Sequence, residues 1–370
     1  MEYCCSGHWK GLEMSNRKSF DDLPKRITRR IKRLALTAAA SFRTKRLIVF
    51  LTPGHELRAG GVLAISDFYR ESEALKALHC SDVALCAVPG DPFLLKYTWF
   101  QNDNYILDLD LLLKCCGPLE YLQLHIPEYR VNRLVDWLNR VSPGLKKKVA
   151  ELHLNVLLQN IDLIEGQNVA GLKNFGQVTC TTAHEAYSNQ ATRDAIDVPL
   201  HRLSICNGPE RHSLTGYEEK EALLIVSHDD HPLKQKVSAQ IAEALPELRI
   251  QVIKDLSFEA YLELIRRAKW SLTFGEGLDS YFVDPVFNGA VSFAVFNDRF
   301  FTRPFADLEN VYPSWNALQQ QIVADLKRLD EPKAYHRCWK ESFVLLSDLY
   351  GVNRFRENLR LFYRGQYTFP

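Results

Sequence analysis

Two carboxylates, Glu276 and Asp284, lie eight positions apart in a segment that could bind a hydroxylated or phosphorylated ligand. The pattern predicts a buried strand over 270–274, a glycine-containing loop, a short helix that ends at Gly289, and another strand over 290–296. In an open parallel sheet, ligands bind at the carboxyl ends of the strands, and a first helical turn offers N–H groups to phosphate. Glu276 is therefore expected on the loop at that edge, and Asp284 inside the helix.

The elements that must position these acids alternate between strands and helices, which is typical of parallel sheets with helices on both faces. A first series covers 46–205 and a second covers 218 to about 300, and Gly208, Pro209 and Gly216 interrupt the regular pattern between them. The other expected strands are 46–52, 82–88, 105–107, 121–125, 152–158, 177–183, 201–205, 222–227 and 249–253. Helices are expected over 315–328, 333–350 and 352–363.

The acids and their setting resemble the GT-B glycosyltransferases, in particular the retaining group that carries a Glu-x7-Glu motif in its second domain. Here Glu276 is followed by seven residues and Asp284, so the second acid is Asp where that group usually has Glu. The resemblance extends in order over roughly 46–301, and its residue-level matches are few. It implies two Rossmann-like domains facing across a cleft, with a C-terminal helix that returns to the first domain.

This resemblance divides the chain into four parts. They are a basic N-terminal segment (1–45), an acceptor-side domain (46–210), a nucleotide-sugar donor domain (211–340) and C-terminal helices that cross back (341–370).

The resemblance also implies roles for individual residues. Glu276 would contact hydroxyls of the donor sugar and Asp284 the nucleotide ribose, whereas Lys234 would neutralise the donor phosphates. His228 lies closest to the place of a phosphate-binding Arg, so the diphosphate site departs from the family pattern there. Asn160 stands where many retaining members have a His near the transferred sugar. The further candidates for ligand binding are Gln159, Gly275, Gly277, Gly60 and Gly61.

Composition limits the partners. The 370 residues include 46 Lys and Arg against 45 Asp and Glu, so no overall charge favours nucleic acid. The nine cysteines include no C-x-x-C pair, and with no recognisable signal sequence we expect reduced thiols. No apolar run approaches the roughly 20 residues that span a bilayer. These features predict a cytoplasmic protein.

The segment from Lys25 to Arg46 contains nine Lys or Arg residues and no acid. Ile27, Ile31, Leu34 and Ala38 recur at helical spacing within it, which predicts a cationic amphipathic helix. One interpretation is peripheral attachment to an anionic membrane, on its inner face, since each basic residue there contributes about 1 kcal/mol. The other is a solvated arm or a helix packed on the first domain.

The resemblance therefore predicts a glycosyltransferase that moves a sugar from a nucleotide-sugar donor to a glycan or lipid-linked glycan, with retention, in surface polysaccharide biosynthesis. It implies no cofactor and no metal, because the departing phosphate itself assists the incoming hydroxyl. Two alternatives remain open. One is an inactive GT-B scaffold, which the departures from the motif favour. The other is a nucleotide-sugar epimerase or an inverting transferase. An inverting enzyme needs a base in the first domain, and His55, Glu56 or His184 could serve.

Overall fold

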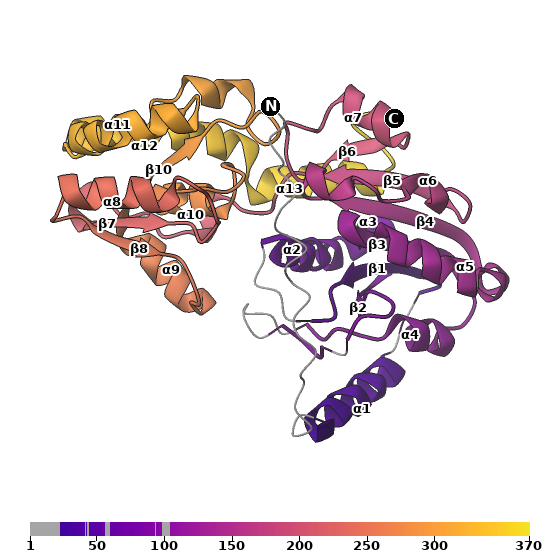
Figure 1. Cartoon of the computed structure of the whole chain (residues 1–370). Helices are drawn as coiled ribbons and strands as arrows, with labels where there is room; N and C mark the ends of the chain where they lie inside the picture. Colours follow the sequence, from indigo (N-terminus) through magenta and orange to yellow (C-terminus); the bar gives the residue numbers. More distant parts are fainter. Residues whose placement is uncertain (1–22, 41, 43, 56–59, 93, 98–103) are drawn as a thin grey trace.

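The computed structural model describes residues 23–40, 42, 44–55, 60–92, 94–97 and 104–370, and these form two α/β lobes (Figure 1). The first lobe contains a parallel sheet in the order β2-β1-β3-β4-β5-β6. Its strands are β1 (Arg46–Thr52), β2 (Asp82–Ala87), β3 (Leu119–Pro127), β4 (Val149–Leu158), β5 (Gln177–Thr182) and β6 (Leu200–Arg202). The second lobe has its own sheet, so the prediction of two separate sheets is confirmed.

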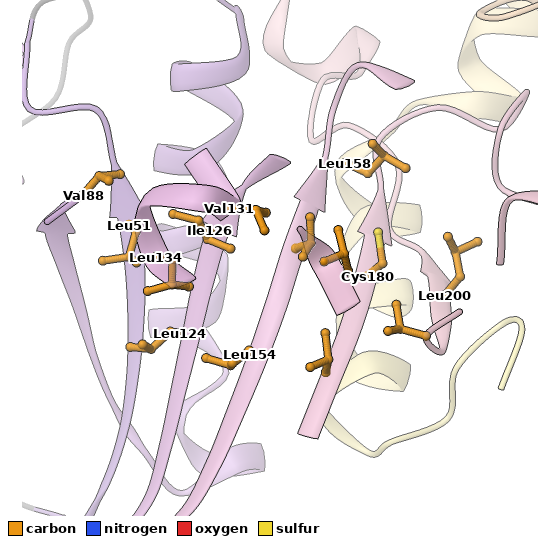
Figure 2. Packing of buried hydrophobic residues seen from close by; sticks show 14 of the residues in the cluster. Leu51, Val88, Leu124, Ile126, Val131, Leu134, Leu154, Leu158, Cys180 and Leu200 are labelled. Atoms are coloured by element: carbon orange, nitrogen blue, oxygen red, sulfur yellow. The ribbon is translucent and has the colours of Figure 1, made fainter. Parts of the chain in front are cut away.

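Both faces of the first sheet are covered, as the apolar sequence of β1 predicts. Alternate side chains of β1 point to opposite faces: Leu47, Val49 and Leu51 belong to one buried cluster, and Ile48 and Phe50 to another. Figure 2 shows the first cluster, in which side chains of β3 and β4 gather with those of helix α5. The helices around this sheet are α2 (Gly60–Ala74), α3 (Lys76–His79), α4 (Leu109–Cys115), α5 (Val131–Lys148), α6 (Val169–Leu172) and α7 (Gln190–Ile196).

The second sheet is also parallel, with the order β11-β10-β9-β7-β8. Its strands are β7 (Glu221–Val226), β8 (Arg249–Val252), β9 (Ala268–Leu272), β10 (Val291–Val295) and β11 (Val311–Tyr312). Its helices are α8 (Lys234–Ala244), α9 (Phe258–Arg267), α10 (Ser280–Phe287), α11 (Trp315–Leu329) and α12 (Pro332–Leu349). The segment from β9 through α10 to β10 is the strand, helix and strand unit expected around the two carboxylates.

The last helix, α13 (Val352–Tyr363), returns to the first lobe, as predicted. Leu359 and Phe362 are buried in the same cluster as Phe50, and the Tyr363 hydroxyl lies 2.6 Å from the Ser72 hydroxyl of α2. The chain therefore ends on the first lobe after passing through the second.

The basic helix α1 (Leu23–Ala39) packs on the first lobe through polar residues. Arg33 and Thr37 are buried, and Arg33 Nη2 donates to the Leu107 carbonyl at 2.9 Å. Ile27 and Ile31 are 50% and 62% exposed. The two isoleucines of the predicted apolar face thus point to solvent, which is the reverse of an ordinary surface helix. Figure 1 shows α1 at the margin of the lobe, beside α4.

One expected strand is wrong. Residues 105–107 form no strand, because only Leu107 pairs with the sheet, through a single bridge to Cys86. The thiol prediction agrees with the described residues, in which all seven cysteines are free and four are buried.

Candidate active site

The two lobes meet at the carboxyl ends of their strands, where Asn160 follows β4 and Glu276 follows β9. The side-chain amide of Asn160 donates to Glu276 Oε1 across the boundary. Asn160 is itself oriented, because its Oδ1 accepts from the backbone N–H of Asp162 at 2.8 Å. An ion pair between Arg299 and Asp162 joins the lobes beside this contact. The structure therefore brings together the two predicted sugar-contacting residues.

Glu276 sits in an acidic environment. Burial, together with the charges of Asp229 and Asp162, raises the pKa of Glu276 to about 7, and the hydrogen bond from Asn160 opposes this rise. The group therefore changes charge near neutral pH. When it is protonated, this carboxyl can donate a hydrogen bond as well as accept one.

A third residue at this junction, Glu128, was missed by the sequence analysis. It follows β3 directly, is 1% exposed, and its Oε1 accepts from the Asn160 backbone N–H at 3.1 Å. Burial raises the pKa of Glu128 to about 8, and the charge of Glu276 contributes. Its Oε2 has no hydrogen-bond partner in the part of the chain that the structure describes. The signal was available, since an acid directly after a long apolar strand lies at the ligand-binding edge.

The glycine loop packs closely against its surroundings. Gly277 has φ +92°, and a Cβ there would lie 2.5 Å from the Phe301 ring. A Cβ on Gly275 would lie 2.7 Å from Asp229 Oδ2 and 3.1 Å from Asp279 Oδ2. Gly277 therefore needs glycine for its backbone conformation, whereas a side chain at Gly275 would have to displace the carboxylate of Asp229.

The start of α10 is capped by the chain itself. Asp279 Oδ1 accepts from the backbone N–H groups of Tyr281, at 2.8 Å, and Phe282, at 3.2 Å. These two N–H groups of the first helical turn are thus already used by Asp279. Burial, with Asp229 and Glu276, raises the pKa of Asp279 well above its ordinary value.

The predicted phosphate ligands lie on the other side of this loop. Lys234 begins α8, and its Nζ donates to the carbonyls of Ser227, at 2.6 Å, and Asp229, at 3.0 Å. An ammonium has three N–H donors, so one more contact fits the geometry. His228 is exposed, and its Nδ1 lies 2.8 Å from the Tyr281 hydroxyl.

Asp284 is placed apart from the Glu276 contact. It is 8% exposed, and its two oxygens accept from Asn207 Nδ2, at 2.7 Å, and from the Tyr261 hydroxyl, at 2.9 Å. Burial raises the pKa of Asp284, and His212 opposes the rise. In this arrangement Asp284 ties the segment between the lobes to α10, and a ribose contact needs one of these bonds to be exchanged.

Gln159 and the paired glycines lie on the first-lobe side. A Cβ on Gly61 would lie 2.1 Å from Gln159 Oε1, so the glycine lets this amide approach the start of α2. A Cβ on Gly60 would meet nothing within 4 Å. These three residues thus line the same strand-end edge as Asn160.

The three residues considered as bases of an inverting transferase lie in different surroundings. Glu56 lies outside the described residues. His55 Nδ1 is 4.0 Å from Asp91. His184 is buried between aromatic rings, with Phe300 of the second lobe 5.8 Å away, and burial lowers the pKa of His184 to about 4. His184 is therefore a neutral packing residue between the lobes.

A cavity of about 390 Å³ opens over the carboxyl ends of β9 and β10. Its lining residues are Gly275, Val295, Phe296, Asn297, Asp298 and Trp315. The Trp315 ring lies 3.9 Å from that of His231 and 5.3 Å from that of Phe274, and those two rings are only 5.6 Å apart. The rings of His231 and Phe274 therefore do not sandwich the indole, and Trp315 itself contributes to the cavity wall. From the sequence, Trp315 was predicted only as the first residue of a helix.

A scan against protein-family models and a search of the curated proteins each find no match. Solved structures do match. HepE of Anabaena, in complex with UDP-glucose, has a TM-score of 0.52 at 9% identity, and the match covers 86% of this chain and 99% of that one. Trehalose-6-phosphate synthase OtsA gives the same values. The N-terminal domain of Candida albicans trehalose-6-phosphate phosphatase has a TM-score of 0.50 at 11% identity, over 87% and 100% of the two chains.

The chain has the GT-B fold. This confirms the predicted fold class, and it shows the fold alone, because identities near 10% carry no assignment of substrate or reaction.

Among the described residues, no three His, Cys, Asp or Glu side chains are arranged to hold a metal ion. No described helix is long and apolar enough to cross a membrane. Metal independence stays a prediction.

Proposed function

We propose that this protein is a glycosyltransferase that moves a sugar from a nucleotide-sugar donor to a glycan or lipid-linked glycan acceptor. The observation that carries the proposal is the contact between Asn160 and Glu276, made beside a cavity large enough for a nucleotide base. Trp315 offers that cavity an aromatic face, and the GT-B neighbour HepE was crystallised with UDP-glucose. The sugar would then lie between the cavity and the Asn160 side chain.

The donor diphosphate needs positive charge or N–H donors near Gly275. Lys234 has one N–H donor beyond its two loop contacts, and Gly60 and Gly61 open α2 in the first lobe. Binding of a diphosphate here is opposed by the negative charges of Asp229, Glu276 and Asp279. The raised pKa values of Glu276 and Asp279 reduce the charge of these two groups at neutral pH. This acidic surrounding favours the second candidate, a GT-B scaffold without transfer activity.

A binding and turnover screen separates the two candidates. Isothermal titration with UDP-, GDP-, ADP- and dTDP-sugars should give saturable binding for at least one donor, and that donor should be hydrolysed or transferred with the nucleoside diphosphate released. Binding without turnover would support the scaffold, and absence of binding across the panel would refute both. Isomerisation of the bound sugar with no release of diphosphate would show the epimerase alternative.

The sequence resemblance adds retention of the anomeric configuration and a role in surface polysaccharide synthesis. An acceptor on a lipid carrier agrees with the exposed face of α1, where Ile27 and Ile31 lie among basic residues. Burying isoleucine in the interface and placing basic residues near anionic headgroups both favour membrane binding. We therefore also propose peripheral attachment through α1.

Vesicle sedimentation tests this attachment. Ile27→Ser with Ile31→Ser should weaken binding to vesicles containing phosphatidylglycerol, and 0.5 M salt should weaken it further. Leu214→Ser is the matched control, since Leu214 is 58% exposed and lies outside α1. Equal binding of the wild type to purely zwitterionic vesicles, or no effect of the double substitution, would contradict the proposal.

A further inference from the structure

The strand ends of the first lobe hold a buried acid that the proposed function does not yet use. Glu128 is 1% exposed, and its carboxyl is fixed by the Asn160 backbone N–H at 3.1 Å. The other oxygen, Oε2, is buried and has no partner among the described residues. Leaving a buried polar atom unpaired costs about 1–3 kcal/mol, so such an atom in a folded protein needs an explanation.

The position of Glu128 supplies one. The same residue, Asn160, donates its backbone N–H to Glu128 and its side-chain amide to Glu276, so the two carboxyl groups flank one amide at the boundary of the lobes. Tyr187 is buried close to them, and its hydroxyl donates to the Gln159 carbonyl at 2.5 Å. The charges of Glu128 and Glu276 both contribute to raising the pKa of Tyr187, which agrees with this proximity.

We propose that Glu128 is the catalytic base, whose Oε2 takes the proton of the acceptor hydroxyl. The proposal rests on the proposed function. In the step, the acceptor oxygen bonds to the anomeric carbon, and the bond from that carbon to the phosphate oxygen breaks. The electron pair leaves with the nucleoside diphosphate, and the acceptor proton passes to Glu128. An incoming hydroxyl also gives Oε2 the hydrogen bond that it lacks.

Glu128 suits this task better than the bases considered from the sequence. A general base acts best when its pKa lies near the working pH. Burial raises the pKa of Glu128 to about 8, whereas His184 is neutral and packed among aromatic rings. Direct displacement assisted by a protein base inverts the anomeric centre. The inference therefore replaces the retention implied by the sequence resemblance.

The test uses the full chain with a nucleotide sugar that it turns over, and water as the acceptor where no other is known. Glu128→Gln keeps the shape of the side chain and cannot take a proton. We expect turnover at pH 8 to fall about 100-fold, in the range of lost general-base catalysis, with binding of the nucleoside diphosphate unchanged within about twofold. The matched control is Glu120→Gln, on β3, the strand that Glu128 follows. The Glu120 side chain is 64% exposed, and this variant should retain full activity.

Two further readouts separate a base from a structural residue. The wild-type rate should rise with pH up to about 8, following Glu128, and the small residual rate of Glu128→Gln should lose this dependence. Proton NMR of the first product should show the anomer opposite to that of the donor.

Retained configuration, undiminished turnover of Glu128→Gln, or a loss confined to diphosphate binding would each overturn the inference and leave the proposed function standing. A wild-type protein that turns over no nucleotide sugar would overturn the proposed function, and with it the role of Glu128.

Discussion

The loop before α10 and the body of α10 carry the two acids of one sequence motif in different surroundings. On the loop, Glu276 meets Asn160 of the other lobe, beside a cavity and near Glu128. In the helix, Asp284 is enclosed by Asn207 and Tyr261, and both of its oxygens are used. Eight residues of spacing can thus separate a carboxyl at the boundary of the lobes from one whose two oxygens are both used inside the fold.

The strongest test of this difference is Glu276→Gln. This substitution removes a group expected to act on the reacting sugar while leaving the side-chain shape, so turnover should fall by about two orders of magnitude. The variant should unfold at the same temperature as the wild type or higher, because a buried carboxyl is replaced by an amide. Steady-state rates and calorimetry measure the two effects. Undiminished turnover would remove Glu276 from the site.

The opposite result is expected for Asp284→Ala. Its removal leaves the Asn207 amide and the Tyr261 hydroxyl without their acceptor, so the free energy of unfolding should fall by about 2 kcal/mol. Turnover per folded molecule should change less than threefold. Urea unfolding and rates at 15 °C check these expectations, and a large loss of donor affinity in a stable variant would restore the ribose contact implied by the sequence resemblance.

The carboxyl of Glu128, at the boundary of the lobes, should make the stability of the protein depend on pH. The pKa of Glu128 is raised in the folded protein from its ordinary 4.5 to about 8. Stability from the protonated carboxyl is fully present below pH 4.5 and is lost as the pH rises to about 8.

Glu128→Gln should therefore match the wild type at pH 4.5 and exceed its unfolding free energy at pH 9 by at least about 1.4 kcal/mol, the value of one pKa unit. Urea titrations at the two pH values measure this. An identical difference at both pH values would show that the buried group is not titrating.

The order of strands and helices could be predicted because apolar runs such as Arg46–Thr52 leave few alternatives. The place of Glu276 also followed, since a loop after a parallel strand lies at the ligand-binding edge. The direction in which the Asp284 side chain points could not be predicted, because it depends on which face of a short helix meets the segment between the lobes. Glu128 was hidden for a similar reason: its burial and its contact with Asn160 arise only when β3 and β4 pair.

The smallest expected effect, on nucleotide affinity, comes from comparing two tryptophans. One lies beside the loop before α10 and the other contacts the body of α10. Trp315 lines the cavity beside the glycine loop, whereas Trp339 donates its Nε1–H to the Val286 carbonyl, at 2.8 Å, in the body of α10. Trp315→Ala should weaken binding of the nucleoside diphosphate by up to about tenfold, because an aromatic contact contributes about 0.5–1.5 kcal/mol beyond buried area. Trp339→Phe should leave that affinity unchanged and lower the unfolding temperature, since it removes a hydrogen bond inside the lobe. Fluorescence titration of both variants decides the matter. If both variants lost affinity equally, the loss at Trp315 could not be assigned to a direct contact with the nucleotide. The nucleotide site would then have to lie outside this cavity.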